Sequence, residues 1–206
     1  MCAARSHHRG LGSFTLIELI MVAALLSLLA AIALPNLLEA RVRAQVARVR
    51  ADLAAMTTAL EAYHVDHVHY PLNGVLYQDG RWDHPQTSAG GAAEHKFTPD
   101  ALTTPVAYLG AIGLDPFMEG TAPPFPEWEG LHGRYFYTNL DWFEELTRPS
   151  PPPVIELMRE RYGRWILASA GPNARRRDLA RNVYYDPTNG TISDGDIVVS
   201  PRRRGR

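Results

Sequence analysis

The 206-residue chain has almost no cysteine and almost no lysine. Its single cysteine, Cys2, excludes an intrachain disulfide framework and a cysteine-based zinc site. Lys96 is the only lysine, so arginine supplies nearly all of the 21 basic side chains. The formal net charge of −1 gives no overall field that would attract nucleic acid, and we expect no nucleic-acid partner. Without a disulfide or a cysteine-based zinc site, the fold must be held by packing, or by a metal with oxygen ligands.

The common motifs of catalysis and nucleotide binding are also absent from the sequence. There is no P-loop, no glycine-rich dinucleotide motif and no H-E-x-x-H sequence. Ser169 precedes a Gly-Pro turn and does not lie in the G-x-S-x-G elbow of a nucleophilic hydrolase. We therefore expect a protein that is not an enzyme.

What the sequence does contain is one long hydrophobic run, residues 14–34, with Glu18 as its only charged side chain. A helix of about 20 apolar residues spans the ~30 Å hydrocarbon core of a membrane. An acid inside such a span is rare, because it costs a few kcal/mol unless it is near an end or paired with a cation. Two other interpretations remain open, namely a plain membrane anchor and a secretory signal peptide cut after Ala33.

A specific motif surrounds the start of this run. It reads Gly12-Ser13-Phe14-Thr15-Leu16-Ile17-Glu18. The motif resembles the processing site of type IV pilins and type II secretion pseudopilins, where a prepilin peptidase removes a leader and methylates the new amine. Because Ser13 stands where the family usually has Gly, cleavage after Gly12 is conceivable, but it would shift Glu18 by one position. The resemblance thus implies a leader of residues 1–13 and cleavage before Phe14.

The resemblance also assigns assembly roles. With Phe14 as the first mature residue, Glu18 is the fifth, and Pro35 falls where many relatives carry a helix-kinking proline. In the family, this acid pairs with the freed amine of the first residue of a neighbouring subunit, so that two buried charges neutralise each other. The implied assembly residues are Phe14, Thr15, Glu18 and Pro35.

Beyond Pro35 the pattern remains helical. Apolar side chains recur every three or four residues, which is typical of a helix with one buried stripe: Val42, Val46, Val49, Leu53, Met56, Leu60 and Tyr63. Charged residues, among them Asp52 and Glu61, occupy the other faces. We expect the stripe, within residues 35–68, to pack on a sheet of its own subunit, while a coiled-coil dimer is the alternative.

The remaining chain, residues 69–200, predicts a globular body. Residues 71–100 read as a long surface loop, and a short helical piece is expected around 154–161. The expected strands are 134–138, 164–169, 182–186, 191–192 and 197–199, with a hairpin turn at 187–190. The predicted fold class is therefore α+β, a long helix on a small antiparallel sheet. The basic tail, residues 201–206, follows. We expect it to be disordered or to touch an acidic neighbour or lipid head groups.

Short motifs in the body extend the resemblance to type II secretion system protein G, the major pseudopilin. They are Leu102-Thr103-Thr104-Pro105, Asp115-Pro116-Phe117, Ser169-Ala170-Gly171-Pro172-Asn173 and Asp194-Gly195-Asp196-Ile197. The resemblance implies a pilin fold and a fibre subunit anchored in the inner membrane by a single span, with its body in the periplasm. Implied partners are further copies of the chain, the prepilin peptidase, the assembly platform with its ATPase, minor pseudopilins and the outer-membrane secretin. A type IV pilin of a surface fibre and a secreted binding protein are the alternatives.

The sequence offers candidate ligands for two metal sites. The resemblance implies a possible Ca²⁺ site in a C-terminal loop, with Asn173, Asp186, Asp194 and Asp196 as candidate ligands. Acids and amides in turns also bond their own backbone, which is the alternative explanation of these residues. The second site is a zinc cluster at the end of the helix, for which a solvated helix end is the favoured interpretation: His64, Asp66, His67 and His69.

Overall fold

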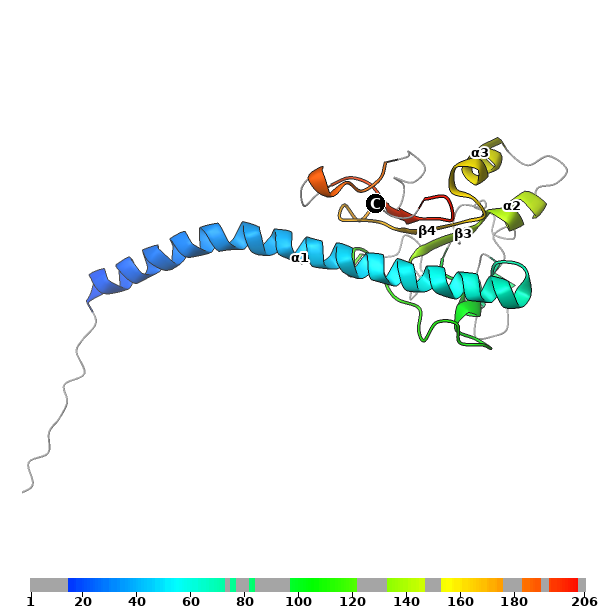
Figure 1. Cartoon of the computed structure of the whole chain (residues 1–206). Helices are drawn as coiled ribbons and strands as arrows, with labels where there is room; N and C mark the ends of the chain where they lie inside the picture. Colours follow the sequence, from blue (N-terminus) through cyan, green and yellow to red (C-terminus); the bar gives the residue numbers. More distant parts are fainter. Residues whose placement is uncertain are drawn as a thin grey trace, which may run out of the picture. The chain divides into compact units, whose positions relative to one another are not determined.

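The computed structural model describes most of the chain in eight segments. These are residues 15–72, 75–76, 82–83, 97–121, 133–146, 153–175, 183–189 and 193–203. The chain divides into two compact units, Met1–Ala40 and Arg41–Arg206 (Figure 1).

The first unit contains the apolar part of α1, a helix that spans Leu16–His67. The large hydrophobic side chains from Leu16 to Leu38 are all between 50% and 76% exposed. Among the described residues, α1 is the one helix long and apolar enough to cross a membrane. An apolar surface of this extent is stabilised by lipid or by other protein chains, and not by water.

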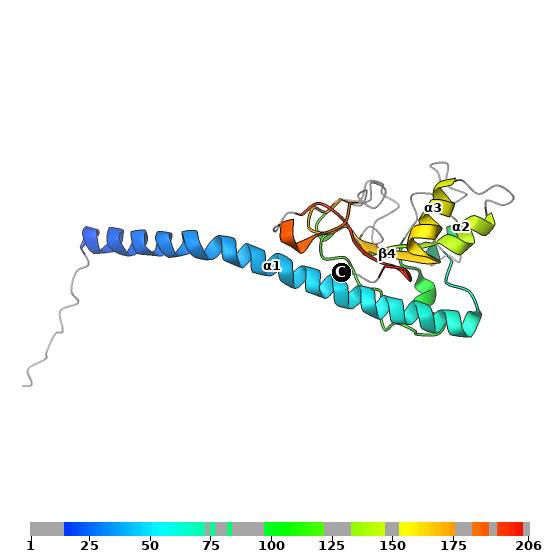
Figure 2. The same ribbon diagram turned by 45° about the horizontal axis from the view of Figure 1, so that its top comes forward.

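The second unit contains a three-stranded antiparallel sheet with the strand order β3-β4-β5. Strand β3 (Phe136–Asn139) pairs with β4 (Trp165–Ser169), and β4 pairs with β5 (Ile197–Val199). Two more helices, α2 (Leu140–Leu146) and α3 (Pro153–Tyr162), lie between β3 and β4 in the chain (Figure 2). The predicted α+β class, the helical piece near 154–161 and the strand at 164–169 are thus confirmed.

The apolar stripe of α1 is buried against one face of this sheet. Val49, Leu53 and Leu60 have no exposed surface, and they share a core with Tyr135, Tyr137, Trp165, Leu167 and Ile197. Val42 and Tyr63, at the ends of the stripe, are partly buried. Because the stripe is occupied within its own unit, the structure favours the sheet-packed helix over the coiled-coil dimer.

The opposite face of the sheet packs under α3. Strand residues alternate between faces, so Leu167 points to α1 while Ile166 and Ala168 point the other way. They form a second cluster with Leu140, Tyr162 and Val198. The unit therefore has three layers, with the sheet in the middle.

Two acids of α1 lie beside the buried stripe, as expected, and also bond aromatic side chains of the body. The Tyr135 hydroxyl donates to Asp52 Oδ2 at 2.7 Å. Glu61 accepts hydrogen bonds from the Tyr70 hydroxyl, at 3.0 Å, and from the Trp165 indole nitrogen, at 3.3 Å. Burial, with the hydrogen bond to Asp52, raises the pKa of Tyr135 far above its usual range. Both acids satisfy aromatic groups that would otherwise be buried without a partner.

Several short elements depart from the prediction. A two-stranded antiparallel pair, β1 (Val75–Leu76) and β2 (Trp82–Asp83), interrupts the predicted loop 71–100. A 3₁₀ helix, η1 (Asp100–Leu102), and α2 were also not predicted.

The hairpin turn predicted at 187–190 is wrong for its described part. Pro187–Asn189 forms a 3₁₀ helix, η4, and Tyr184 makes an isolated parallel bridge with Asp196 where an antiparallel strand was expected. The Asp186 carboxylate accepts from the Thr188 nitrogen, at 2.9 Å, and from its hydroxyl, at 2.7 Å, and so turns the chain locally. Residues 190–192 lie outside the described residues.

The start of the basic tail is also part of the body. The Arg203 guanidinium lies 3.4 Å from the centre of the Tyr184 ring, and the Arg202 nitrogen donates to the Tyr162 carbonyl at 3.3 Å. The expectation of a disordered or outward-reaching tail is therefore wrong for residues 201–203. A cation over an aromatic face is attracted by the ring quadrupole, which the sequence pattern could not reveal.

One buried carboxylate joins two distant parts of the fold. Asp115, which is 2% exposed, accepts the Phe117 backbone nitrogen at 3.0 Å on Oδ1 and the Ala170 nitrogen at 2.9 Å on Oδ2. It thereby holds the turn after residue 114 against the segment that follows β4.

We predict that Leu53→Ala lowers the free energy of unfolding by about 2–5 kcal/mol, because it leaves a cavity in the core under the sheet. Urea unfolding of the detergent-solubilised chain, followed by tryptophan fluorescence, measures the loss. Leu53→Met, which conserves volume, is the control and should cost less than about 1.5 kcal/mol. A neutral Leu53→Ala would contradict the burial of the stripe.

We predict that Asp115→Ala lowers the free energy of unfolding by about 2–4 kcal/mol, since two backbone N–H groups lose a charged acceptor. Asp115→Asn keeps one oxygen acceptor and should lose less. The same urea titration compares the two variants, and equal losses would show that the carboxylate does not bridge these segments.

Candidate functional site

The first candidate site lies at the start of α1. The described residues begin at Thr15, so the processing residues Gly12, Ser13 and Phe14 lie outside the described residues, and the processing prediction stays untested. Thr15 directly precedes Leu16, the first residue of α1.

Thr15 and Glu18 bond each other. Glu18 Oε2 accepts from the Thr15 backbone nitrogen at 2.9 Å and from its hydroxyl at 2.8 Å, and the Glu18 nitrogen faces Thr15 Oγ1 at 3.4 Å. This reciprocal arrangement is a capping box, in which a Thr and a Glu three residues later satisfy donors at a helix start. The T-x-x-E spacing predicts this capping box from the sequence. The family resemblance, in contrast, implies for Glu18 only a contact between subunits.

The rest of the apolar segment has almost no polar content. Between residues 16 and 38, Glu18 is the one ionisable side chain. The hydroxyl of Ser27 donates to the Ala23 carbonyl at 2.8 Å, so the helix itself satisfies it. Pro35 lies inside α1, where its ring nitrogen cannot donate to the carbonyl one turn earlier. The carboxylate of Glu18 is therefore the group through which this segment can recognise a charged partner.

The second candidate site is the C-terminal loop with the proposed calcium ligands. Asn173 Nδ2 donates to Asp194 Oδ1 at 3.2 Å, while Asn173 Oδ1 accepts the Arg175 nitrogen at 3.0 Å. The bond from Arg175 fixes which way the Asn173 amide faces, so that it presents N–H to Asp194. The structure thus brings Asn173 and Asp194 together.

The other two candidates do not join this pair. Asp186 is turned to Thr188, whose nitrogen and hydroxyl lower the pKa of the Asp186 carboxyl. Asp196 is 3% exposed and lies in the bridge to Tyr184. Among the described residues, no group of three His, Cys, Asp or Glu side chains is placed to hold a metal ion. Calcium takes six to eight oxygen ligands, among them carboxylates and backbone carbonyls. The structure bonds Asn173 to Asp194, and calcium binding at this loop stays a prediction.

Two glycines shape this loop through close backbone approach. Gly171 has φ +69°, and a Cβ there would come within 2.3 Å of the Gly195 carbonyl oxygen. Gly195 has φ +115°, and a Cβ there would come within 2.3 Å of the Tyr184 carbonyl carbon. Three segments therefore meet at a distance that only glycine permits.

The histidines at the end of α1 are packed among aromatic rings. His64 stacks on Tyr70, with ring centroids 4.4 Å apart, and its Nε2 accepts from Arg164 at 2.9 Å. His67 lies 4.2 Å from the Tyr63 ring centroid. The described residues contain no group of three His, Cys, Asp or Glu side chains placed to hold a metal ion, and the residues at this helix end are among those searched. Nothing in this part of the structure therefore supports the zinc alternative.

Tyr108 closes this aromatic group at the end of the helix. Its hydroxyl donates to Asp66 Oδ2 at 2.7 Å, and this bond raises the pKa of Tyr108 to about 12. The end of the helix is therefore solvent-exposed, as expected, and Tyr108 also ties it to the loop that follows η1.

Comparison with known proteins found no matching family model and no matching solved structure. Curated proteins do match. The type IV major pilin protein PilA of Myxococcus xanthus is 30% identical over 125 residues, 58% of this chain and 56% of that protein. The type IV wide pilus major component PilA4 of Thermus thermophilus is 43% identical over 65 residues, 32% of this chain and 50% of that protein. The type II secretion system core protein G of Escherichia coli is 34% identical over 58 residues, 28% of this chain and 40% of that protein.

The chain thus spans about half the length of the curated relatives it matches. The long apolar helix and these relatives support a single-pass membrane anchor. The predicted resemblance is confirmed, and the chain is related to type IV pilins and to type II secretion core protein G.

Proposed function

We propose that this chain is a structural subunit of a fibre, processed by a prepilin peptidase and polymerised into the pseudopilus of a type II secretion system. The observation that carries the proposal is the isolated Glu18 carboxylate near the start of an exposed, otherwise apolar helix. The curated relatives, which are pilins and core protein G, support the same class of protein. A structural role fits a chain whose sequence carries no motif of catalysis.

The physical basis is a change of partner at Glu18. In a single chain its carboxylate accepts two hydrogen bonds from Thr15. In the fibre, the amine freed at Phe14 of a neighbouring subunit supplies a positive charge, so that the bond joins two ionised groups and no longer one. Because apolar packing is not directional, this pair sets the register in which the helices stack.

Assembly then removes the exposed side chains of α1 from lipid. Helices in a membrane associate through packing and polar contacts, because lipid is as apolar as their own surfaces. The assembly platform with its ATPase is the partner that draws subunits from the inner membrane. Minor pseudopilins and the outer-membrane secretin complete the machinery, and the body faces the periplasm.

A type IV pilin of a surface fibre for adhesion, motility or DNA uptake is the second candidate, because two of the relatives are type IV pilins. Neighbouring genes separate the two candidates: a secretin with minor pseudopilins favours the pseudopilus, and a retraction ATPase favours the pilus. Calcium binding at the C-terminal loop stays a prediction.

We predict that Glu18→Ala leaves membrane insertion and the folded body intact but abolishes fibres, because the register-setting charge is lost. Formaldehyde crosslinking of cells and sedimentation of sheared fibres measure assembly. Ser27→Ala is the matched control, since it removes another polar side chain of the segment, whose hydroxyl donates to the carbonyl of Ala23 in its own helix. Normal fibres from Glu18→Ala would remove the mechanism.

We predict that the mature chain begins at Phe14, with a methylated amine, since cleavage there keeps Glu18 in the fifth position. Mass spectrometry of the N-terminal peptide from the native host checks this. A chain that starts at Met1 contradicts processing, and one that starts at Leu34 identifies a secreted protein with a cleaved signal peptide.

A further inference from the structure

A short basic segment of α1 follows the apolar part of the helix. Residues 40–51 contain four arginines and no acidic side chain, and all four arginines are exposed: Arg41, Arg43, Arg48 and Arg50. The formal net charge of the whole chain is only −1, so this excess of positive charge is local. A local surface cluster of one sign attracts a partner of the opposite sign.

The helix places these arginines on both sides of its buried stripe. Arg41 and Arg43 are two positions apart, which turns their side chains about 160° away from each other. Between the two sides, Val46 and Val49 are buried in the core of the body. A partner that surrounds the helix can contact both sides at once, whereas a partner docked on one face cannot. The head groups of a bilayer surround a spanning helix in this way.

Distance from the apolar segment divides the arginines into two pairs. Leu38 is the last exposed large apolar side chain before them. The lower pair, Arg41 and Arg43, follows Leu38 by about 5 and 8 Å along α1. The upper pair, Arg48 and Arg50, follows it by about 15 and 18 Å. The polar layer on each side of a bilayer is about 5–8 Å thick, because a membrane of about 40–45 Å encloses a core of about 30 Å. With Leu38 at the edge of the core, the lower pair lies at the level of the head groups.

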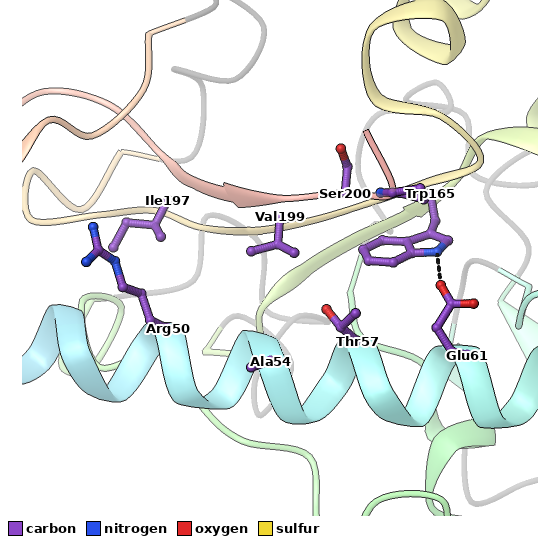
Figure 3. A pocket seen from close by; sticks show the side chains of 9 residues that line it. Arg50, Ala54, Thr57, Glu61, Trp165, Ile197, Val199 and Ser200 are labelled. Carbon is purple, nitrogen blue, oxygen red and sulfur yellow. Dashed lines mark hydrogen bonds between the residues drawn. The ribbon is translucent and has the colours of Figure 1, made fainter. Parts of the chain in front are cut away.

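The upper pair lies beside groups of the body. Arg48 Nε is 3.8 Å from Asp52 Oδ2, one turn later on α1. Arg50 extends from α1 toward Ile197 of β5, and the two side chains line a cavity of about 580 Å³ (Figure 3). The upper pair therefore differs from the lower pair in its surroundings as well as in its distance from Leu38.

The lower pair has donors for an anion. The nearest acid in the sequence, Glu39, precedes Arg43 by four positions, a spacing at which the two side chains pair on a helix. A guanidinium carries five N–H donors, so one such pair leaves donors for a second anion. Its planar fork matches two oxygens of a phosphate, which makes arginine well suited to phosphate recognition.

We propose that Arg41 and Arg43 bind the phosphate groups of anionic phospholipids in the leaflet that the body faces. The bound head groups fix how deeply the apolar helix sits in the membrane. They also hold the start of the second unit at the membrane surface. The inference needs the membrane anchor but not the fibre, and so it goes beyond the proposed function.

Spin-labelled lipids test this with the full chain in phosphatidylcholine vesicles. The fraction of labelled lipid that the chain immobilises gives the association constant of that lipid relative to phosphatidylcholine. Arg5 and Arg9, which precede the apolar run, are replaced by glutamine in the parent chain and in every variant. An arginine near the membrane surface favours an anionic lipid by about fivefold, so labelled phosphatidylglycerol should associate with the parent chain about fivefold more strongly than labelled phosphatidylcholine.

The variant Arg41→Gln/Arg43→Gln should lower this ratio to about one. The matched control is Arg48→Gln/Arg50→Gln, which removes the same charge from the same two sides of the same helix, two turns further from Leu38. Its ratio should stay close to that of the parent chain. Tryptophan fluorescence during urea unfolding verifies that both variants are folded.

Three results would overturn the inference, and each leaves the proposed function standing, because Glu18→Ala tests that separately. Equal ratios for Arg41→Gln/Arg43→Gln and the parent chain would show that the lower pair does not bind head groups. Equal losses from both pairs would show a general attraction of positive charge in place of a site. A parent ratio near one would reject lipid binding, and a loss of fibres from Arg41→Gln/Arg43→Gln in cells would then assign the lower pair to a protein contact.

Discussion

A carboxylate inside an apolar helix must find donors, because its charge is poorly solvated away from water. Glu18 finds them in Thr15, one turn back, through a capping box that satisfies the helix start and the acid at once. The box keeps the acid at the N-terminal end of α1, where the partial positive charge of the helix favours an anion. Between residues 16 and 38 no other side chain is ionisable. The Glu18 carboxylate therefore distinguishes the N-terminal end of the apolar helix from the rest of it.

The rest of α1 shows how one helix serves two environments. From Leu16 to Leu38 the apolar side chains cover every face, which suits a surround of lipid or of similar helices. From Val46 to Leu60 the buried apolar side chains are confined to one stripe. This stripe packs against the sheet of the same unit. The boundary between the two units falls at Ala40, shortly after Pro35. The change from an all-round to a one-sided pattern is therefore the change from an anchor to a core helix.

The elements that depend on local periodicity could be predicted from the sequence. The stripe of α1, the helix α3 and the strand β4 each have a repeat of 3.6 or a run of β-branched and aromatic residues. The contacts that depend on residues far apart in the chain could not. Tyr135 reaches Asp52 across 83 positions, and Asp115 reaches Ala170 across 55. Neither acid differs in its local pattern from one that faces solvent.

The same distinction explains the candidate sites. Glu18 was identified because its spacing from Phe14 belongs to a motif, yet its bond to Thr15 was overlooked, although the spacing is equally local. The calcium candidates were chosen by residue type, but their directions are set by neighbours: Thr188 turns Asp186 and Arg175 turns Asn173. Residue type alone does not determine where lone pairs point.

In the C-terminal loop, three segments of the backbone come into close contact. Gly171 and Gly195 let three segments approach so closely that a single methyl group at either position would collide with backbone. The Asn173 amide donates to Asp194 and adds a neutral hydrogen bond to these contacts. A loop closed by glycine contacts and a neutral hydrogen bond holds Asp196 and the start of β5 in place by sterics.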